Sequence, residues 1–137
     1  PNEARTPTVG GEIVPRKILV VDDNHDIAYT LSTLLMISGH TTLIAYDGHE
    51  AISKVTEFEP EVIVLDIGLP GMDGHETCKE LRKTDAGKRA VIIALTGWGQ
   101  DEDRRLSEEA GFDAHLVKPV NHRNIMELAE SLLKSRV

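Results

Sequence analysis

One stretch, residues 61–74, constrains the fold more than any other part of the chain. It opens with apolar residues, most of them β-branched (VIVL at 62–65), and this run ends in a single carboxylate, Asp66. Such a run is typical of a strand that is buried on both faces of a sheet. The loop that follows contains three glycines and one proline, which mark a turn. Open α/β sheets bind ligands beyond the carboxyl ends of their strands, so Asp66 is the first candidate site residue.

Apolar runs alternate with segments of helical periodicity from residue 17 onward. Five successive strand–helix pairs predict a mostly parallel sheet with helices on both faces, which is a doubly wound α/β fold. In the first helix, we expect Ile27, Leu31, Leu34 and Leu35 to face the core. The strands are predicted over residues 17–21, 41–45, 62–66, 90–95 and 113–117, with a polar loop over 82–89 and a charged helix over about 100–110.

The first 16 residues are rich in proline and glycine and lack apolar periodicity. We therefore predict a flexible linker or tail over residues 1–16 and one domain over residues 17–137. The sequence begins with Pro1, so we expect a piece of a longer or processed protein. No apolar run has the length of a membrane span and no secretory signal is evident, which predicts a cytoplasmic location without membrane contact by this domain.

The formal net charge of −8 argues against direct binding to nucleic acid, because phosphate backbones are bound by an excess of Lys and Arg. Cys78 is the single cysteine, so an internal disulfide and a cysteine-based zinc site are excluded, and we expect it to pack as a small apolar residue. The remaining histidines without ligand spacing are expected at the surface. They are His25, His40, His49, His75 and His122.

Polar groups follow four of the five predicted strands: Asp22 and Asp23, Asp66, Thr96 and Lys118. Parallel strands place their carboxyl ends on one edge of the sheet, so these groups converge if the strands are neighbours. Carboxylates about 4 Å apart repel one another by roughly 4 kcal/mol at an effective dielectric constant near 20. A cluster of three therefore needs a cation or a raised pKa. Mg²⁺ suits it, because this ion binds through one or two carboxylates plus phosphate oxygens.

These groups are the parts that phosphoryl transfer requires. We take Asp66 as the nucleophile, because it alone lies between a buried strand and a Gly/Pro loop. Lys118 supplies a positive charge and Thr96 a hydroxyl donor for phosphoryl oxygens. Each residue alone has an ordinary alternative role: a helix N-cap for Asp22 and Asp23, a turn residue, a loop hydroxyl or a solvated charge. Their joint placement favours the site.

Four motifs, in the same order and at similar spacing, resemble the receiver domain of two-component response regulators. They are ILVVDDN at 18–24, VIVLDIGLPGMDG at 62–74, ALTG at 94–97 and LVKPV at 116–120. The resemblance implies a flavodoxin-like fold with the strand order 2-1-3-4-5. It also implies that Asp66 accepts a phosphoryl group from a histidine kinase or a histidine phosphotransfer protein.

The same resemblance implies a metal-dependent reaction with Mg²⁺, or Mn²⁺ as a substitute, in which Lys118 and Thr96 contact the phosphoryl group. The bond between Lys118 and Pro119 is expected to be cis. The domain would catalyse only its own phosphorylation and dephosphorylation. The implied metal ligands are the side chains of Asp23 and Asp66, the backbone carbonyl of Gly68 and, mainly through water, Asp22.

In this family, a hydroxyl and an aromatic ring form a switch, which corresponds here to Thr96 and His115. Phosphorylation would draw Thr96 inward and let His115 follow, which alters the face made by the fourth helix, the fifth strand and the last helix. The ring at this position is commonly Tyr or Phe, and a structural role for His115 is equally open. Gly97 and Trp98 would border the pocket, where Trp98 either slows water attack or packs the loop.

The motifs most resemble receivers attached to hybrid sensor histidine kinases, so we expect such a parent or another multidomain protein. One alternative is a constitutive interaction module that never transfers phosphate, which the complete site disfavours. The other alternative is a conventional enzyme or cofactor-binding protein with the same fold. A dinucleotide site needs a Gly-rich turn where Asp22 and Asp23 lie, and an aspartyl phosphatase needs a second carboxylate where Gly68 lies. The sequence indicates no particular output partner.

Overall fold

The computed structural model describes residues 13–97 and 109–136. Five parallel strands form one sheet in the order β2-β1-β3-β4-β5, which confirms the predicted fold class and strand order. The three central strands are buried along nearly their whole length, which explains their uninterrupted apolar sequences. The strands are β1 (Lys17–Val21), β2 (Thr41–Ala45), β3 (Val62–Asp66), β4 (Val91–Thr96) and β5 (Ala114–Val117).

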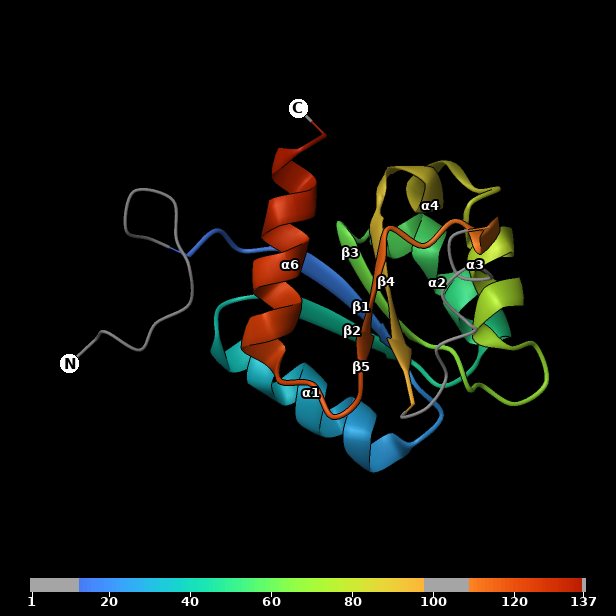
Figure 1. Ribbon diagram of the computed structural model, residues 1–137, viewed down its shortest axis with the longest axis horizontal. Coiled ribbons are helices and arrows are strands. Elements are labelled where there is room, and N and C mark those ends of the chain that lie inside the picture. The colour runs from blue at the N-terminus through green and yellow to red at the C-terminus, as the bar shows by residue number, and fades with distance from the viewer. Residues whose placement is uncertain (1–12, 98–108, 137) are drawn as a thin grey trace.

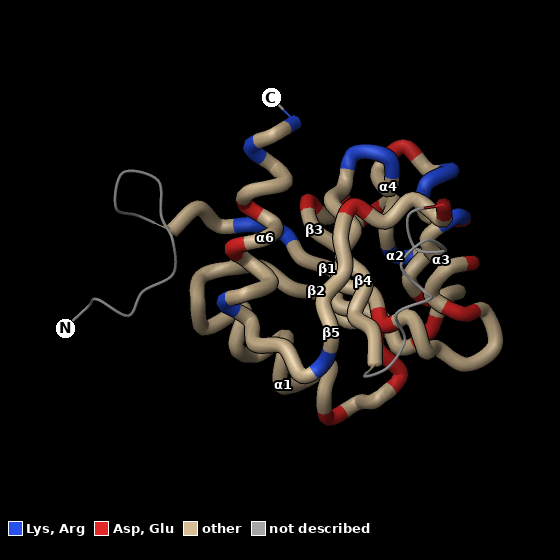
Figure 2. Tube along the Cα trace, in the orientation of Figure 1, with Lys and Arg blue, Asp and Glu red and all other residues tan. Residues whose placement is uncertain are grey.

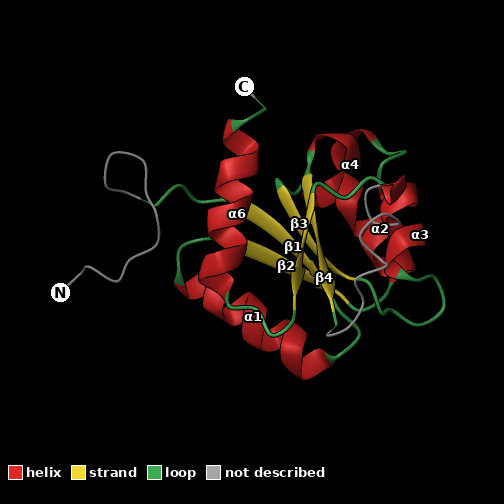
Figure 3. Ribbon diagram, in the orientation of Figure 1, coloured by secondary structure: helices red, strands yellow, loops and turns green. Residues whose placement is uncertain are grey.

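Helices cover both faces of the sheet (Figures 1 and 3). On one face lie α1 (His25–Ile37) and α6 (His122–Lys134), and on the other lie α2 (Gly48–Phe58), α3 (Gly74–Leu81) and α4 (Asp85–Arg89). Within residues 13–97 and 109–136, no helix is long and apolar enough to cross a membrane. The charged helix predicted over about residues 100–110 lies largely outside the described residues.

Alternation along the strands divides the core into two layers. On β3, Val62 and Val64 pack toward α1 and α6, whereas Ile63 and Leu65 pack toward α2, α3 and α4. Cys78 belongs to the second layer as predicted, and burial raises the pKa of its thiol to about 12.

Each described helix begins with a side-chain cap. The cap accepts a hydrogen bond from the backbone N–H three residues later, which satisfies one of the free donors at the helix start. Four of these helices begin in the loop that directly follows a strand, so the caps also fix the loops that carry the polar strand ends. The caps are Asn24, Asp47, Asp73, Thr84 and Asn121.

Two predictions about the helices are wrong. Residues 82–89 are not merely a polar loop, because Thr84 caps the short helix α4 and Thr84 Oγ1 accepts the N–H of Gly87 at 2.9 Å.

In α1, Ile27 and Leu34 are 43% and 39% exposed. The inner face of α1 is formed instead by Ala28, Leu31, Ser32 and Leu35.

His40 is buried, contrary to the surface position that the sequence predicts. Its Nδ1 accepts a hydrogen bond of 3.0 Å from the backbone N–H of Arg16, and burial lowers the pKa of the imidazole. The guanidinium of Arg16 also forms a two-pronged pair with Glu130 of α6, at 2.8 Å for each hydrogen bond. Arg16 is therefore attached to the domain, one residue before the predicted domain boundary.

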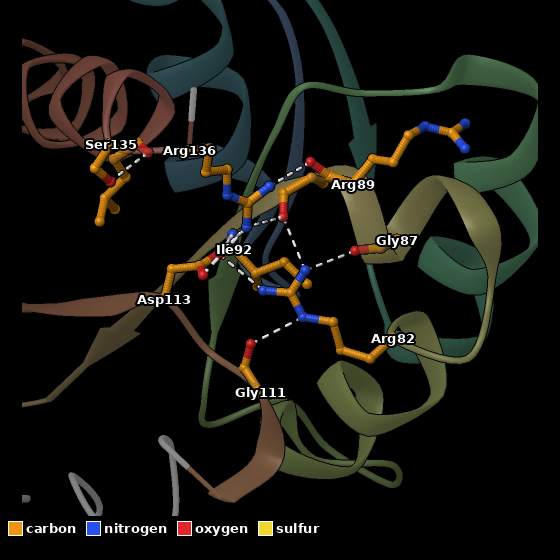
Figure 4. Close-up of polar contacts among 10 residues, drawn as sticks. Arg82, Gly87, Arg89, Ile92, Gly111, Asp113, Ser135 and Arg136 are labelled. Carbon is orange, nitrogen blue, oxygen red and sulfur yellow. Dashed lines mark hydrogen bonds and ion pairs between the residues drawn. The ribbon is translucent and has the colours of Figure 1, made fainter.

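At the amino ends of the strands, Asp113 joins segments that are far apart in the sequence (Figure 4). Its carboxylate accepts hydrogen bonds from the Ile92 N–H at 2.8 Å, from Arg82 at 2.8 Å and from Arg136 at 3.2 Å. Arg82, which ends α3, also donates to the carbonyls of Gly87 in α4, of Ala90 before β4 and of Gly111 before β5. Together with the Arg136 bond, these contacts fasten α3, α4 and the end of α6 to the sheet. Figure 2 shows further Lys and Arg residues around α4, in contrast to the overall negative charge.

Glu59 ends α2 in the left-handed conformation, with φ of 51° and ψ of 60°. Helices usually place glycine at such a position, because a Cβ atom is unfavourable there. We expect Glu59→Gly to raise the free energy of unfolding by about 1 kcal/mol, measured by urea denaturation. The matched control is Glu57→Gly, within the helix and also exposed, which should lower it by about 1 kcal/mol. A loss of stability in Glu59→Gly would contradict this account.

Candidate functional site

The polar strand ends meet at the carboxyl edge of the sheet. Asp66 is the last residue of β3 and Thr96 the last of β4, while Asp22 and Lys118 directly follow β1 and β5. These four strands are consecutive neighbours in the sheet, so a parallel arrangement brings their ends together. The structure therefore collects residues that are up to 96 positions apart in the sequence (118 − 22).

Three carboxylates form the acidic part of the site. Asp22, Asp23 and Asp66 each offer an oxygen atom, and these atoms lie within 4.8 Å of one another. Asp22 and Asp66 are buried, at 2% and 8% exposure, whereas Asp23 is exposed. Lys118 Nζ lies 3.2 Å from Asp66 Oδ2 and 3.8 Å from Asp22 Oδ2. One lysine thus faces two buried carboxylates, which leaves an excess of negative charge.

Asp22 carries the clearest sign of this imbalance. Its Oδ1 accepts the backbone N–H of Asn24 at 2.9 Å, but its buried Oδ2 has no hydrogen-bond partner. Burial and the negative charge of Asp66 raise the pKa of the Asp22 carboxyl above its ordinary value. Hard cations bind to clustered carboxylate oxygens of this kind, so the residues fit a Mg²⁺ ion.

Helix capping does not account for the two carboxylates that follow β1. The N-cap of α1 is Asn24, whose Oδ1 accepts the Ile27 N–H at 3.1 Å. Asp22 and Asp23 lie before this cap, so the alternative in which they are merely N-caps is wrong.

The loop after β3 holds Asp66 from both sides. The backbone N–H of Gly68 donates to Asp66 Oδ1 at 3.0 Å, and Ile67 and Gly74 are joined by a backbone hydrogen bond of 3.0 Å. A Cβ atom on Gly74 would lie 2.5 Å from the Cα of Ile67. Only glycine allows this close approach, which folds the loop back against the strand that carries Asp66.

Thr96 and His115 lie on the same side of the sheet, because His115 is paired with Ala94, two residues before Thr96. Thr96 is 3% exposed, and its hydroxyl is directed toward the Leu116 carbonyl at 3.5 Å. His115 is half-buried on β5. Thr96 and Lys118 are also joined through the backbone, since the Lys118 N–H donates to the Thr96 carbonyl at 2.8 Å.

The remaining site residues lie around this edge. The peptide bond between Lys118 and Pro119 is cis. Gly97 directly follows β4 and is half-buried, whereas Trp98 lies outside the described residues.

One pair of residues at the same edge does not follow from the motifs. The rings of His25 and Tyr46 are stacked, with centroids 3.8 Å apart and an angle of 18° between their planes. The sequence predicts only that His25 lies at the surface. Tyr46 directly follows β2, so the strand-end argument that gathers the other polar groups also points to its position.

The sequence profile of the response regulator receiver domain matches residues 18–130, which is most of the chain. This chain is a response regulator receiver domain. The receiver assignment made from the four motifs is therefore confirmed, and the domain belongs to two-component signalling.

Solved structures of other receiver domains agree with the fold. Vibrio cholerae CheY4 is 30% identical with a TM-score of 0.80, over 86% of this chain and 98% of that one. A CheY-like receiver protein from Methanospirillum hungatei is 30% identical with a TM-score of 0.79, over 89% and 96%. The receiver domain of a sensor histidine kinase from Pseudomonas aeruginosa, with a magnesium ion coordinated in its active site cleft, is 27% identical with a TM-score of 0.77, over 86% and 97%.

In this receiver domain, we expect Asp22→Asn to raise the free energy of unfolding without metal by about 1–2 kcal/mol at neutral pH. The substitution removes a buried charge but keeps an oxygen for the Asn24 N–H. The pKa of Asp22 is higher in the folded state than in the unfolded state. The ionised carboxylate therefore lowers the free energy of unfolding of the wild type above the folded-state pKa, and this loss disappears as the pH falls through that pKa. The gap between variant and wild type should therefore narrow on acidification.

Urea denaturation in EDTA at a series of pH values measures this gap. Asp23→Asn is the matched control, because its carboxylate is exposed and its removal should change the stability much less. A metal-free Asp22→Asn variant that is less stable than the wild type would contradict the charge argument.

Proposed function

We propose that this receiver domain accepts a phosphoryl group on Asp66 from a phosphohistidine donor, in a reaction that requires Mg²⁺. The observation that carries the proposal is the contact of Asp66 Oδ2 with Lys118 Nζ at 3.2 Å, beside two further carboxylates. A buried carboxylate paired with a lysine could be only a structural ion pair. The two further carboxylates argue against that explanation, because their repulsion destabilises the carboxyl edge of the sheet unless a positively charged ligand binds there.

The transfer needs little from the protein beyond positioning and charge. An oxygen of Asp66 attacks phosphorus, the bond from phosphorus to the donor's imidazole nitrogen breaks, and that nitrogen keeps the electron pair. Lys118 lies close enough to Asp66 to contact an oxygen of the transferred group. The Gly68 N–H holds Asp66 Oδ1, so the other oxygen, Oδ2, faces Lys118 and is the proposed nucleophile.

Asp22, Asp23 and Asp66 would hold the metal ion, with the backbone carbonyl of Gly68 as a further ligand. When bound, Mg²⁺ supplies positive charge to the phosphoryl oxygens. The unpartnered Oδ2 of Asp22 and the magnesium ion in the P. aeruginosa receiver domain both support this assignment. Mn²⁺ prefers the same oxygen ligands and is compared in the experiment below.

Phosphorylation is proposed to act on the partners through Thr96 and His115. The Thr96 hydroxyl is directed toward the carbonyl of Leu116 on β5 at 3.5 Å, which is a long hydrogen bond that is easily given up. A phosphoryl oxygen on Asp66 offers a charged acceptor instead. Turning Thr96 toward it would free space beside His115 and change the surface formed by β5 and its neighbouring helices. Gly97 and Trp98 remain the proposed border of the pocket.

The flank of α1 is the proposed docking surface for the phosphodonor. From Ile27 to Gly39 the sequence contains no charged residue. Tyr29 is 68% and Ile37 76% exposed, and Met36 is also exposed. This uncharged surface begins three residues after Asn24, at the metal-binding turn, so a partner that covers it also reaches Asp66. The proposed donors are helical histidine kinases and histidine phosphotransfer proteins. An apolar helix of the donor would pack against this uncharged surface of α1.

The proposed parent is a hybrid histidine kinase or another multidomain protein with a receiver. Similarity to the receiver domain of the P. aeruginosa sensor kinase supports it. A kinase core encoded upstream of this domain in the same open reading frame would support the hybrid kinase, and an open reading frame that encodes this domain alone would contradict both kinds of parent. The competing function, a constitutive interaction module, predicts that no phosphoryl group is ever transferred.

We expect one phosphoryl adduct on the wild type after incubation with acetyl phosphate and Mg²⁺, detected by intact mass, and none without the metal. Asp66→Asn should give no adduct, because the amide is not a nucleophile. Asp73→Asn is the matched control, since this exposed aspartate caps α3 in the same loop and Asn also caps well. Parallel samples contain Mn²⁺. If calorimetry shows that Mg²⁺ does not bind and no adduct forms, the constitutive module is the better explanation.

For docking, we expect Tyr29→Lys to slow phosphorylation by a phosphorylated protein donor at least about tenfold, because the new charge must be desolvated at the contact. Acetyl phosphate should still phosphorylate this variant at the wild-type rate. The donors to test are the histidine kinases and histidine phosphotransfer proteins of the source organism, each phosphorylated on histidine. Thr56→Lys adds the same charge at an exposed position of α2 and should have no effect. Equal transfer to both variants would exclude docking at α1.

A further inference from the structure

The turn that carries Asp23 is attached at two points to the end of β2 and the residue that follows it. On one side of Asp23, the Asp22 N–H donates to the carbonyl of Ala45 at 3.1 Å. On the other side, the ring of His25 is stacked on the ring of Tyr46 at 3.8 Å. Ala45 is the last residue of β2 and Tyr46 is the next residue, so two neighbouring residues hold the turn on both sides of the aspartate.

Tyr46 is itself held firmly. Its backbone N–H donates to Glu50 Oε1 at 2.5 Å, and the Glu50 N–H donates to Asp47 at 2.8 Å, so Tyr46 is fixed by the first turn of α2. Its ring is half-buried and packs against the core layer beneath α1 and α6. His25, in contrast, is exposed at the start of α1. The stack therefore joins a fixed ring to an exposed turn.

The Asp23 carboxylate has no such support. Among residues 13–97 and 109–136, no hydrogen bond or ion pair fixes the Asp23 side chain, whereas Asp22 is bonded to Asn24 and Asp66 to Gly68 and Lys118. The position of Asp23 depends on the backbone of the turn alone. A ligand group that must be ordered when the metal binds lowers the affinity, because the lost conformational freedom opposes binding.

We propose that Tyr46 is a positioning residue for the metal site, which acts through its stack with His25 to hold the turn that presents Asp23. This inference rests on the proposed Mg²⁺ site and adds a residue that follows β2, a strand whose end carries none of the polar groups gathered from β1, β3, β4 and β5. The aromatic face is the essential feature, since the phenolic hydroxyl takes no part in the stack. Tyr46→Phe should therefore preserve the effect, whereas Tyr46→Leu should abolish it and still fill the core.

Calorimetric titration of the metal-free chain with Mg²⁺ at one fixed pH tests the proposal. Aromatic pairs contribute modestly to the free energy that holds two segments together. Tyr46→Leu and His25→Ala should therefore each raise the Mg²⁺ dissociation constant about three- to tenfold. Tyr46→Phe should bind like the wild type. In the double variant His25→Ala/Tyr46→Leu, the second substitution should add little, because the stack is already lost. His49→Ala, an exposed histidine in the first turn of α2, is the matched control and should leave the affinity unchanged.

Urea denaturation in EDTA separates positioning from general destabilisation. His25→Ala is expected to bind Mg²⁺ more weakly with little change in metal-free stability, because His25 is exposed. If Tyr46→Leu does not fold, His25→Ala decides the matter alone. Wild-type affinity in His25→Ala, or fully additive losses in the double variant, overturns this inference but leaves the metal site intact. A wild type that does not bind Mg²⁺ at all overturns both the inference and the metal requirement of the proposed function.

Discussion

The parallel arrangement of β1, β3, β4 and β5 forces like charges together, and much of the site is a response to that constraint. The ends of parallel strands lie on one edge, so Asp22 and Asp66 become close neighbours and both are buried. Lys118 offsets part of the repulsion from its place after β5. The repulsion that Lys118 does not offset is evident at Asp22, which has a buried carboxylate oxygen without a hydrogen bond and a raised pKa. The metal-free domain thus keeps an unfavourable charge arrangement that a cation would relieve.

The same topology explains why the gathering of these polar groups at one edge could be predicted from the sequence. A buried parallel strand has an unmistakable apolar run, and the residue where the run ends is placed on a known edge of the sheet. Asp66, Thr96 and Lys118 follow from this rule with no knowledge of side-chain contacts. The strand order itself came from the family resemblance, because apolar runs alone do not fix which strands are neighbours.

The features that the sequence missed depend on neighbours rather than on periodicity. Ile27 and Leu34 have the spacing of a core face together with Leu31 and Leu35. The buried face is instead rotated around the helix axis toward Ala28 and Ser32, whose small side chains let the helix approach the sheet. His40 is buried because Arg16 lies against it, and no local pattern connects residues 24 positions apart. The short helix α4 depends on its cap at Thr84, which a polar segment conceals. Each of these outcomes is decided by what packs next to the residue.

The Asp113 cluster has a mechanical consequence for β5. This strand is pinned where it begins, because Asp113 binds Arg82, Arg136 and the start of β4, whereas its other end leads to Lys118 and an exposed loop. The carboxyl end of β5 is paired with β4 and is joined to Thr96 through the Lys118 N–H, close to Asp66. If phosphorylation of Asp66 moves Lys118 or Thr96, the displacement should therefore be larger at the carboxyl end of β5 and the start of α6 than near Arg136, where the Asp113 cluster holds the chain.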